Sequence, residues 1–158
     1  MNFSGNNKMQ WSIDNNFLIG SSNPNFSDIK KLFSTGFKSI ISFLYNNETP
    51  NYNKKKAEKL GFIIYSIPIK DLSAPTISDF MLFFNKLHNS LERGKVLIHC
   101  QGGKGRTGTF AAAYWIKKGL SAKEAIKKVR KNQPEAIETN AQEDILFELE
   151  RRLKEMII

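Results

Sequence analysis

Short runs of apolar, β-branched and aromatic residues recur along this chain, and each run is about as long as a β-strand. Turn residues or helical patterns separate most of the runs, as expected of the strands of a folded sheet. The runs that predict strands are Met9–Ile13, Phe17–Ile19, Ser39–Phe43, Phe62–Ile67 and Lys95–His99.

Between and after these runs, apolar residues recur every three or four positions, which predicts amphipathic helices. The spacing is clearest over Ile77–Leu91, where Ser78 and Asp79 offer capping oxygens near the start. The other predicted helices are Asn25–Thr35, Asn53–Leu60, Thr107–Lys118, Ser121–Asn132 and Asn140–Glu155. Helix-breaking residues end most of them, namely Gly36, Gly61, Gly94, Gly119 and Pro134.

Strands that alternate with helices, followed by a helical tail, predict an α/β fold. We expect a central, mostly parallel sheet of about four to five strands, flanked by helices on both faces. With 158 residues, the chain has the length of one domain, so residues 1–158 are expected to form a single catalytic domain. In such sheets ligands bind beyond the carboxyl ends of the strands, which directs attention to the residues after Lys95–His99.

The composition excludes several classes of protein. Hydrophobic residues make up 41% of the chain and charged residues 25%, so neither a disordered nor a fibrous protein is indicated. No apolar run approaches the roughly 20 residues that cross a bilayer, and the polar start of the chain is not of the secretory type. The single cysteine cannot form an internal disulfide, which fits a reducing compartment. We therefore expect a cytoplasmic location.

The formal net charge of +9 is concentrated in one stretch. Lys117–Lys131 contains seven basic residues and one acid, Glu124. Most of these side chains are interpreted as a solvated helix face, because apolar residues take the positions at helical spacing. A field that attracts anionic substrates is the functional alternative. Nucleic acid is not the favoured partner, because neither interleaved aromatics nor a known motif accompanies the charge.

The loop after the Lys95–His99 run carries the strongest chemical signal. It reads His99-Cys100-Gln101-Gly102-Gly103-Lys104-Gly105-Arg106-Thr107. A glycine-rich loop between a strand and a helix lets backbone N–H groups converge on an anion, and the helix N-terminus adds positive charge. Arg106 can grip two phosphate oxygens at once. Cys100 would lie in this positive environment, which stabilises a thiolate, and a thiolate beneath a bound phosphate is a nucleophile aimed at phosphorus.

The other residues of the loop have supporting roles in this interpretation. His99 is expected to face the domain interior and to hydrogen-bond the loop backbone. Thr107 could donate its hydroxyl to the sulfur and stabilise it as a leaving group. The predicted phosphate-binding residues are Gln101, Gly102, Gly103, Lys104, Gly105 and Arg106.

Other interpretations of the same residues are weaker. Gly103, Gly105 and Gly108 formally match a dinucleotide-binding fingerprint, but the acidic residue and strand that should follow about 20 positions later are missing. The Walker A pattern fails because Lys104 is followed by Gly105 instead of Ser or Thr. Cys100 could also be a small buried hydrophobe.

His-Cys-x5-Arg followed by Thr-Gly resembles the active-site signature of the protein tyrosine phosphatase superfamily. From Trp11 to the final helix, the chain is similar to its small dual-specificity members. In that family the segment matching Ile67–Asp71 carries the general acid, and the segment matching Ile137–Glu143 helps to position water. The resemblance therefore implies that Asp71 protonates the leaving group and that Gln142, or alternatively Glu138, assists the water.

Structural roles for the same residues stay open at this point. Asp71 lies between two prolines, Pro68 and Pro75, where an Asp can simply form a turn or pair with Lys70. Gln142 lies near a helix start and could be a cap. Trp11 is expected in the core.

The expected function is hydrolysis of phosphomonoesters through a cysteinyl-phosphate intermediate. No metal or other cofactor is expected, because the loop donors and Arg106 supply the positive charge. Phosphotyrosine on a protein is the first-choice substrate, with phosphoserine and phosphothreonine possible in a shallow pocket. A lipid or inositol phosphate, an RNA 5′-phosphate, or a phosphate-binding module without activity are the alternatives. Lys104 resembles a basic residue of phosphoinositide-cleaving members, but Gln101 replaces the lysine that they usually carry after the cysteine.

Overall fold

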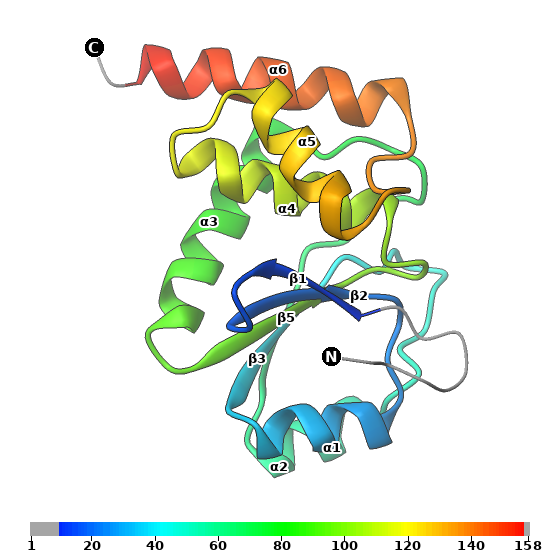
Figure 1. Cartoon of the computed structure of the whole chain (residues 1–158). Coiled ribbons are helices and arrows are strands. Elements are labelled where there is room, and N and C mark those ends of the chain that lie inside the picture. Colours follow the sequence, from blue (N-terminus) through cyan, green and yellow to red (C-terminus); the bar gives the residue numbers. More distant parts are fainter. Residues whose placement is uncertain (1–9, 157–158) are drawn as a thin grey trace.

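The computed structural model describes residues 10–156, which form an α/β domain with one central sheet (Figure 1). The five strands are β1 (Gln10–Asp14), β2 (Leu18–Ser21), β3 (Phe37–Ser42), β4 (Ile63–Ser66) and β5 (Lys95–His99). They lie in the order β1-β2-β5-β3-β4. Only β1 pairs antiparallel with its neighbour; β2, β3, β4 and β5 run parallel. The predicted mostly parallel sheet is confirmed.

Helices cover both faces of the sheet (Figure 1). They are α1 (Phe26–Ser34), α2 (Lys54–Leu60), α3 (Ile77–Leu91), α4 (Gly105–Lys117), α5 (Ala122–Asn132) and α6 (Asn140–Glu155). Helices α1 and α2 lie on one face, and α3 to α6 lie on the other. Helix α4 is buried along almost its whole length between the sheet and helices α5 and α6.

The two faces of β5 show why the sheet needs both helical layers. Val96 and Ile98 belong to the core beneath α3–α6, whereas Leu97 belongs to the core beneath α1 and α2. Successive side chains of a strand point to opposite faces, so a continuous apolar run is buried on both. Stacked and edge-on phenylalanine rings dominate the larger core, with the Phe43 and Phe110 centroids 3.9 Å apart. These contacts join α4, which follows the glycine-rich loop, to α3 and to the end of β3.

The structure corrects the expected cap of one helix and the start of another. Helix α3 is capped by Thr76, whose Oγ1 accepts a hydrogen bond from the Asp79 N–H at 3.1 Å, while Asp79 accepts one from the Thr76 N–H at 2.8 Å. Asp79 therefore takes part in the cap as expected, but Ser78 lies inside the helix. Helix α4 begins at Gly105 instead of Thr107, so Arg106 is already helical. Met9, the expected start of the first strand, lies outside the described residues.

None of the helices in residues 10–156 combines the length and the apolar character that a membrane-crossing segment requires.

Candidate active site

The glycine-rich loop lies at the carboxyl end of β5, between β5 and α4. Strands β2 and β3 flank β5 and run parallel to it, so their carboxyl ends converge on the same edge of the sheet. Segments that follow these strands therefore surround the loop, which is the position where open α/β sheets bind ligands.

Two hydrogen-bond donors hold the sulfur of Cys100. The Thr107 hydroxyl donates to Cys100 Sγ at 3.0 Å, and the Gly103 N–H donates at 3.3 Å. The cysteine is only 2% exposed, so these donors replace the water that would otherwise solvate it. The structure thus brings Thr107 to the atom that the sequence interpretation assigned to it.

The turn of the loop depends on a close backbone approach at Gly103. Its φ is +74°, and a Cβ there would clash with the backbone of Ser21 and Ser22. The Trp11 indole N–H donates to the Gly103 carbonyl at 2.9 Å across the buried edge of the sheet. Trp11 lies in the core as expected, but sequence reasoning missed this second role, because nothing local links it to a loop 92 residues away.

Gln101 is held by the segment between β2 and α1. Asn23 donates its backbone N–H to the Gln101 carbonyl at 3.0 Å and its side-chain amide to Gln101 Oε1 at 3.1 Å. Asn23 in turn accepts a hydrogen bond from the Asn51 N–H at 3.0 Å. Sequence reasoning did not single out Asn23, which fixes the exposed side of the loop.

His99 faces the interior and holds the start of the loop. Its Nδ1 lies 3.1 Å from the Cys100 carbonyl, and its Nε2 lies 2.8 Å from the hydroxyl of buried Tyr52. A carbonyl can only accept, so Nδ1 carries the proton and Nε2 accepts from Tyr52. Burial lowers the pKa of His99 to about 4, which keeps the ring neutral and preserves this pattern.

Arg106 is the most deeply buried charge beside the loop, with only 1% of its side chain exposed. Its Nη1 and Nη2 donate to the two carboxylate oxygens of Glu48 at 2.6 and 3.0 Å, and Nη1 also donates to the Ile69 carbonyl at 2.9 Å. Its Nε has no hydrogen-bond partner among the residues that the structure describes. One N–H of the buried guanidinium is therefore left without an acceptor in this part of the chain.

Glu48 is the principal site residue that sequence reasoning missed. It lies in the loop between β3 and α2, 58 residues before Arg106, and resembles any other loop carboxylate in the sequence. The hydrogen bonds from Arg106 lower the pKa of Glu48, although burial opposes this. Burial opposes the charge of Arg106 as well, but Glu48 and the nearby charges of Cys100 and Asp71 raise its pKa on balance.

Asp71 lies next to Arg106 in the loop that follows β4. Its Oδ1 is 3.3 Å from Arg106 Nη2, while 64% of its side chain is exposed. The same Oδ1 accepts a hydrogen bond from the Leu72 N–H at 3.0 Å. The structure therefore brings the expected general acid to the arginine of the loop and leaves it open to solvent. It also uses Asp71 as a local turn residue, as the structural interpretation expects, while the role of Asp71 as general acid stays a prediction.

Gln142 joins the loop that contains Asp71 and Ser73 to the segment before α6. Its Oε1 accepts from the Glu138 N–H at 2.8 Å, and its Nε2 donates to the Ser73 carbonyl at 3.3 Å. A Cβ placed on Gly105 would lie 3.3 Å from Gln142 Nε2 and 2.6 Å from Glu138 Oε1. Gln142 is fully buried and completes the cap of α6, yet it lies beside the catalytic loop. Glu138, the alternative, lies against the same glycine.

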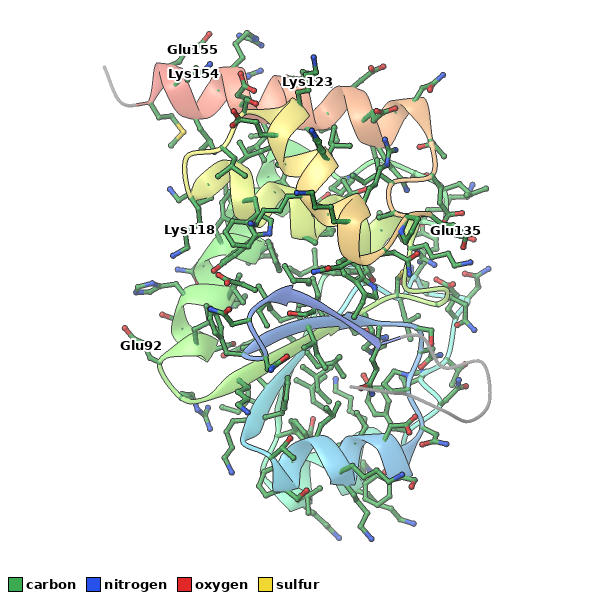
Figure 2. All side chains as sticks on the ribbon, in the orientation of Figure 1. Glu92, Lys118, Lys123, Glu135, Lys154 and Glu155 are labelled. Atoms are coloured by element: carbon green, nitrogen blue, oxygen red, sulfur yellow. The ribbon has the colours of Figure 1, made fainter. Side chains whose placement is uncertain are left out.

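Lys104 turns away from the sulfur, toward the segment between α5 and α6. Its ammonium forms a salt bridge with Glu135, and this hydrogen bond raises the pKa of Lys104. Figure 2 labels Glu135 at the edge of the molecule on this side. The lysine of the loop therefore contributes a compensated charge.

Comparisons with known proteins agree with the geometry. A family model for the DSP-PTPase phosphatase domain of Swiss Army Knife proteins matches residues 6–146. The structure of Tk-PTP in its active form is 33% identical with a TM-score of 0.82, covering 89% of this chain and 95% of that one. This chain belongs to the dual-specificity phosphatase domains of the protein tyrosine phosphatase superfamily, which confirms the resemblance.

Curated relatives carry different names. Protein tyrosine phosphatase domain-containing protein 1 of Bos taurus is 27% identical over 84% of this chain. Phosphatidylglycerophosphate phosphatase PTPMT2 of Arabidopsis thaliana is 29% identical over 89% of it. The chain spans 19% of the first relative and 63% of the second.

We expect protonation of His99 to destabilise the fold in acid. Its pKa is about 4 when folded and about 6.5 when unfolded, so the unfolded state binds the proton more readily. The contribution should be complete above about pH 6.5, and roughly 3 kcal/mol of the free energy of unfolding should be lost as the pH falls to about 4. Urea unfolding of the wild type and of His99→Gln across this range measures it.

His88→Gln provides the control, because His88 is exposed and is the only other histidine. It should keep the pH dependence of the wild type, whereas His99→Gln should show a smaller decline. Equal declines in wild type and His99→Gln would contradict the assignment.

Proposed function

We propose that this chain is a cysteine-dependent phosphatase that hydrolyses phosphomonoesters on proteins, with phosphotyrosine as the preferred substrate. One observation carries the proposal: Cys100 Sγ with two donors, the buried fork of Arg106, and the carboxyl of Asp71 meet at one loop. These are the nucleophile, the anion-binding cation and the acid that phosphoryl transfer to sulfur requires.

In the first step the thiolate of Cys100 attacks phosphorus. The S–P bond forms as the P–O bond to the leaving group breaks, and the carboxylic acid of Asp71 transfers its proton to the departing oxygen. The loop N–H groups and the free Nε of Arg106 stabilise the charge on the equatorial oxygens. Positioning and charge stabilisation account for most of the acceleration, so no metal is required.

In the second step water hydrolyses the cysteinyl-phosphate. Asp71, now a carboxylate, takes a proton from the water while the water oxygen attacks phosphorus. The S–P bond then breaks and returns the thiolate. Gln142 supports this step by holding the acid loop through the Ser73 carbonyl, beside Gly105. The same step would regenerate the enzyme with any phosphomonoester.

The arrangement of Lys104 favours a protein substrate over an inositol polyphosphate. A basic loop side chain that binds a second phosphate must present an uncompensated charge, whereas Lys104 is paired with Glu135. Gln101, at the position after the cysteine, is neutral and engaged with Asn23. Neither side chain therefore offers a free positive charge to a second phosphate. Phosphatase assays with lipid, inositol and RNA phosphates test the alternative substrates.

Cys100→Ser should abolish turnover of p-nitrophenyl phosphate and retain phosphate binding. A serine hydroxyl ionises far less than a thiol, while Arg106 and the loop donors are unchanged. Steady-state kinetics and isothermal titration with phosphate measure the two effects. Wild-type activity should survive EDTA, and iodoacetate should remove it. Activity in the serine variant, or dependence on a divalent metal, would overturn the mechanism; binding without turnover by the wild type would indicate a binding module.

Asp71→Asn should slow hydrolysis by about 10²- to 10⁴-fold, the usual effect of losing a general acid. The loss should be smaller for leaving groups that depart without a proton, because they do not need the acid. The alkaline limb of the pH–rate profile should flatten, since it reports the acid losing its proton. An unchanged profile would assign the role to another carboxylate, and Asp79 would be tested next.

Lys104→Ala should lower kcat/KM modestly and similarly on a phosphotyrosine peptide and on soluble inositol polyphosphates, because its charge is compensated. The matched variant Glu135→Gln frees the ammonium of Lys104, so it should raise kcat/KM for the inositol phosphates relative to kcat/KM for the peptide. The protein substrate would be rejected in favour of a lipid-type one by two results together. Lys104→Ala would lower kcat/KM on the inositol phosphates alone, and the wild type would hydrolyse those substrates faster than the peptide.

A further inference from the structure

A groove of about 450 Å³ lies between α5 and α6, away from the catalytic sulfur. Four basic side chains and two apolar ones form most of its lining: Lys123, Lys127, Arg130, Lys131, Ile126 and Phe147. Phe147 is half exposed, at 50%. The groove therefore combines an apolar floor with a strongly basic wall.

Most of the positive charge of this wall is not compensated. Glu143 is the only acid that lines the groove, and it lies 3.6 Å from Arg130. No ion pair involves Lys123, Lys127 or Lys131 among residues 10–156, and none of the three lies over an aromatic ring there. This contrasts with Lys104, which Glu135 holds. Three free cations beside an exposed aromatic ring provide charge complementarity to an acidic ligand that carries an apolar group.

The spacing of the lysines matches an extended chain. Lys123, Lys127 and Lys131 follow one another every four residues along α5, which places them about 6 Å apart along the helix axis. Every second side chain of an extended strand lies on the same side, at intervals of about 6.6 Å. Acidic residues at alternate positions would therefore meet successive lysines, and the residues between them would point toward Phe147 on α6.

The groove is also connected to the catalytic loop. Arg130, in its wall, donates to the carbonyls of Ala136 and Ile137 at 2.9 and 3.0 Å. The Ile137 N–H in turn donates to the Lys104 carbonyl at 3.2 Å. Arg130 also lines a second hollow that contains Lys104 and Glu135. The groove and the loop thus lie on one continuous surface.

We propose that the α5–α6 groove is a docking site for an extended acidic segment of the phosphoprotein substrate, with acids at alternate positions and an aromatic or large aliphatic residue between them. This inference rests on the proposed protein phosphatase function and specifies its substrate. The groove carries its lysines on α5 and its exposed aromatic ring on α6, so an extended peptide with acids on one side and an apolar residue on the other complements it.

The first test measures binding of a fluorescein-labelled, unphosphorylated peptide containing Asp-Ser-Asp-Phe-Asp by fluorescence anisotropy. A peptide of the same composition with its three acids adjacent is the control. The alternating peptide should bind several-fold more tightly, and its affinity should fall as salt is raised. Equal affinities for the two peptides would show that only net charge is recognised and would overturn the proposal.

The second test changes the protein. The triple variant Lys123→Gln, Lys127→Gln, Lys131→Gln should bind the alternating peptide roughly tenfold more weakly, the effect of losing three exposed ion pairs. Phe147→Ser should also weaken binding. A control triple variant removes the same charge from α2, at the opposite end of the molecule (Figure 1). It carries Lys55→Gln, Lys56→Gln and Lys59→Gln, and it should bind the alternating peptide as tightly as the wild type does. Equal losses in the two triple variants would overturn the proposal.

Two further measurements separate the possible failures. Hydrolysis of p-nitrophenyl phosphate should be the same in both triple variants and in the wild type, and circular dichroism should show that each is folded. Absence of this activity in the wild type would reject the proposed function, whereas normal activity without peptide binding would reject the docking site alone. Cosedimentation with phosphatidylserine vesicles that depends on the three α5 lysines, without peptide binding, would assign the groove to a membrane instead.

Discussion

The buried guanidinium of Arg106 is the constraint on which the rest of the site depends. Removing a charge from water is costly unless hydrogen bonds and an opposite charge replace the lost solvation. The partners of Arg106 come from two separate segments: Glu48 follows β3, while the carbonyl of Ile69 and the carboxylate of Asp71 belong to the loop after β4. Each segment is thereby drawn to the carboxyl edge of the sheet. The loop that contains Asp71 lies against Arg106 because the buried arginine needs these partners.

The hydrogen bonds that replace water around the guanidinium of Arg106 also fix its orientation. Glu48 engages Nη1 and Nη2 with its two oxygens, which fixes the plane of the guanidinium and leaves Nε free. A phosphate would then meet a donor that is already positioned, and little reorganisation would accompany binding. Trp11 and His99 do the same for the loop, since each hydrogen-bonds one of its carbonyls and restricts the backbone. The neutral state of His99, imposed by burial, belongs to this arrangement.

Local patterns predicted the sheet, the helices and the loop, because each is encoded within a few consecutive residues. The β5 bounds agree with the Lys95–His99 run, and the glycine-rich loop is read directly from its sequence. Asp71 came from a family resemblance. Glu48 and Tyr52 could not be found this way, because their importance arises only when the fold brings them to Arg106 and His99, 58 and 47 residues away. Fifteen acids occur in the chain, and no local feature distinguishes Glu48 from the others.

The net charge illustrates the same difference between sequence and structure. In the sequence, Lys104 appears to be the important cation because it lies in the catalytic loop, and the basic stretch around α5 resembles an ordinary solvated face. In the structure, Glu135 compensates Lys104, while three lysines of α5 remain unpaired around an exposed Phe147. The field that reaches a ligand is set by the charges that are not neutralised. The proposed docking site therefore assigns specificity for an extended acidic partner to α5 and α6, and leaves to the loop the chemistry that any phosphomonoester would share.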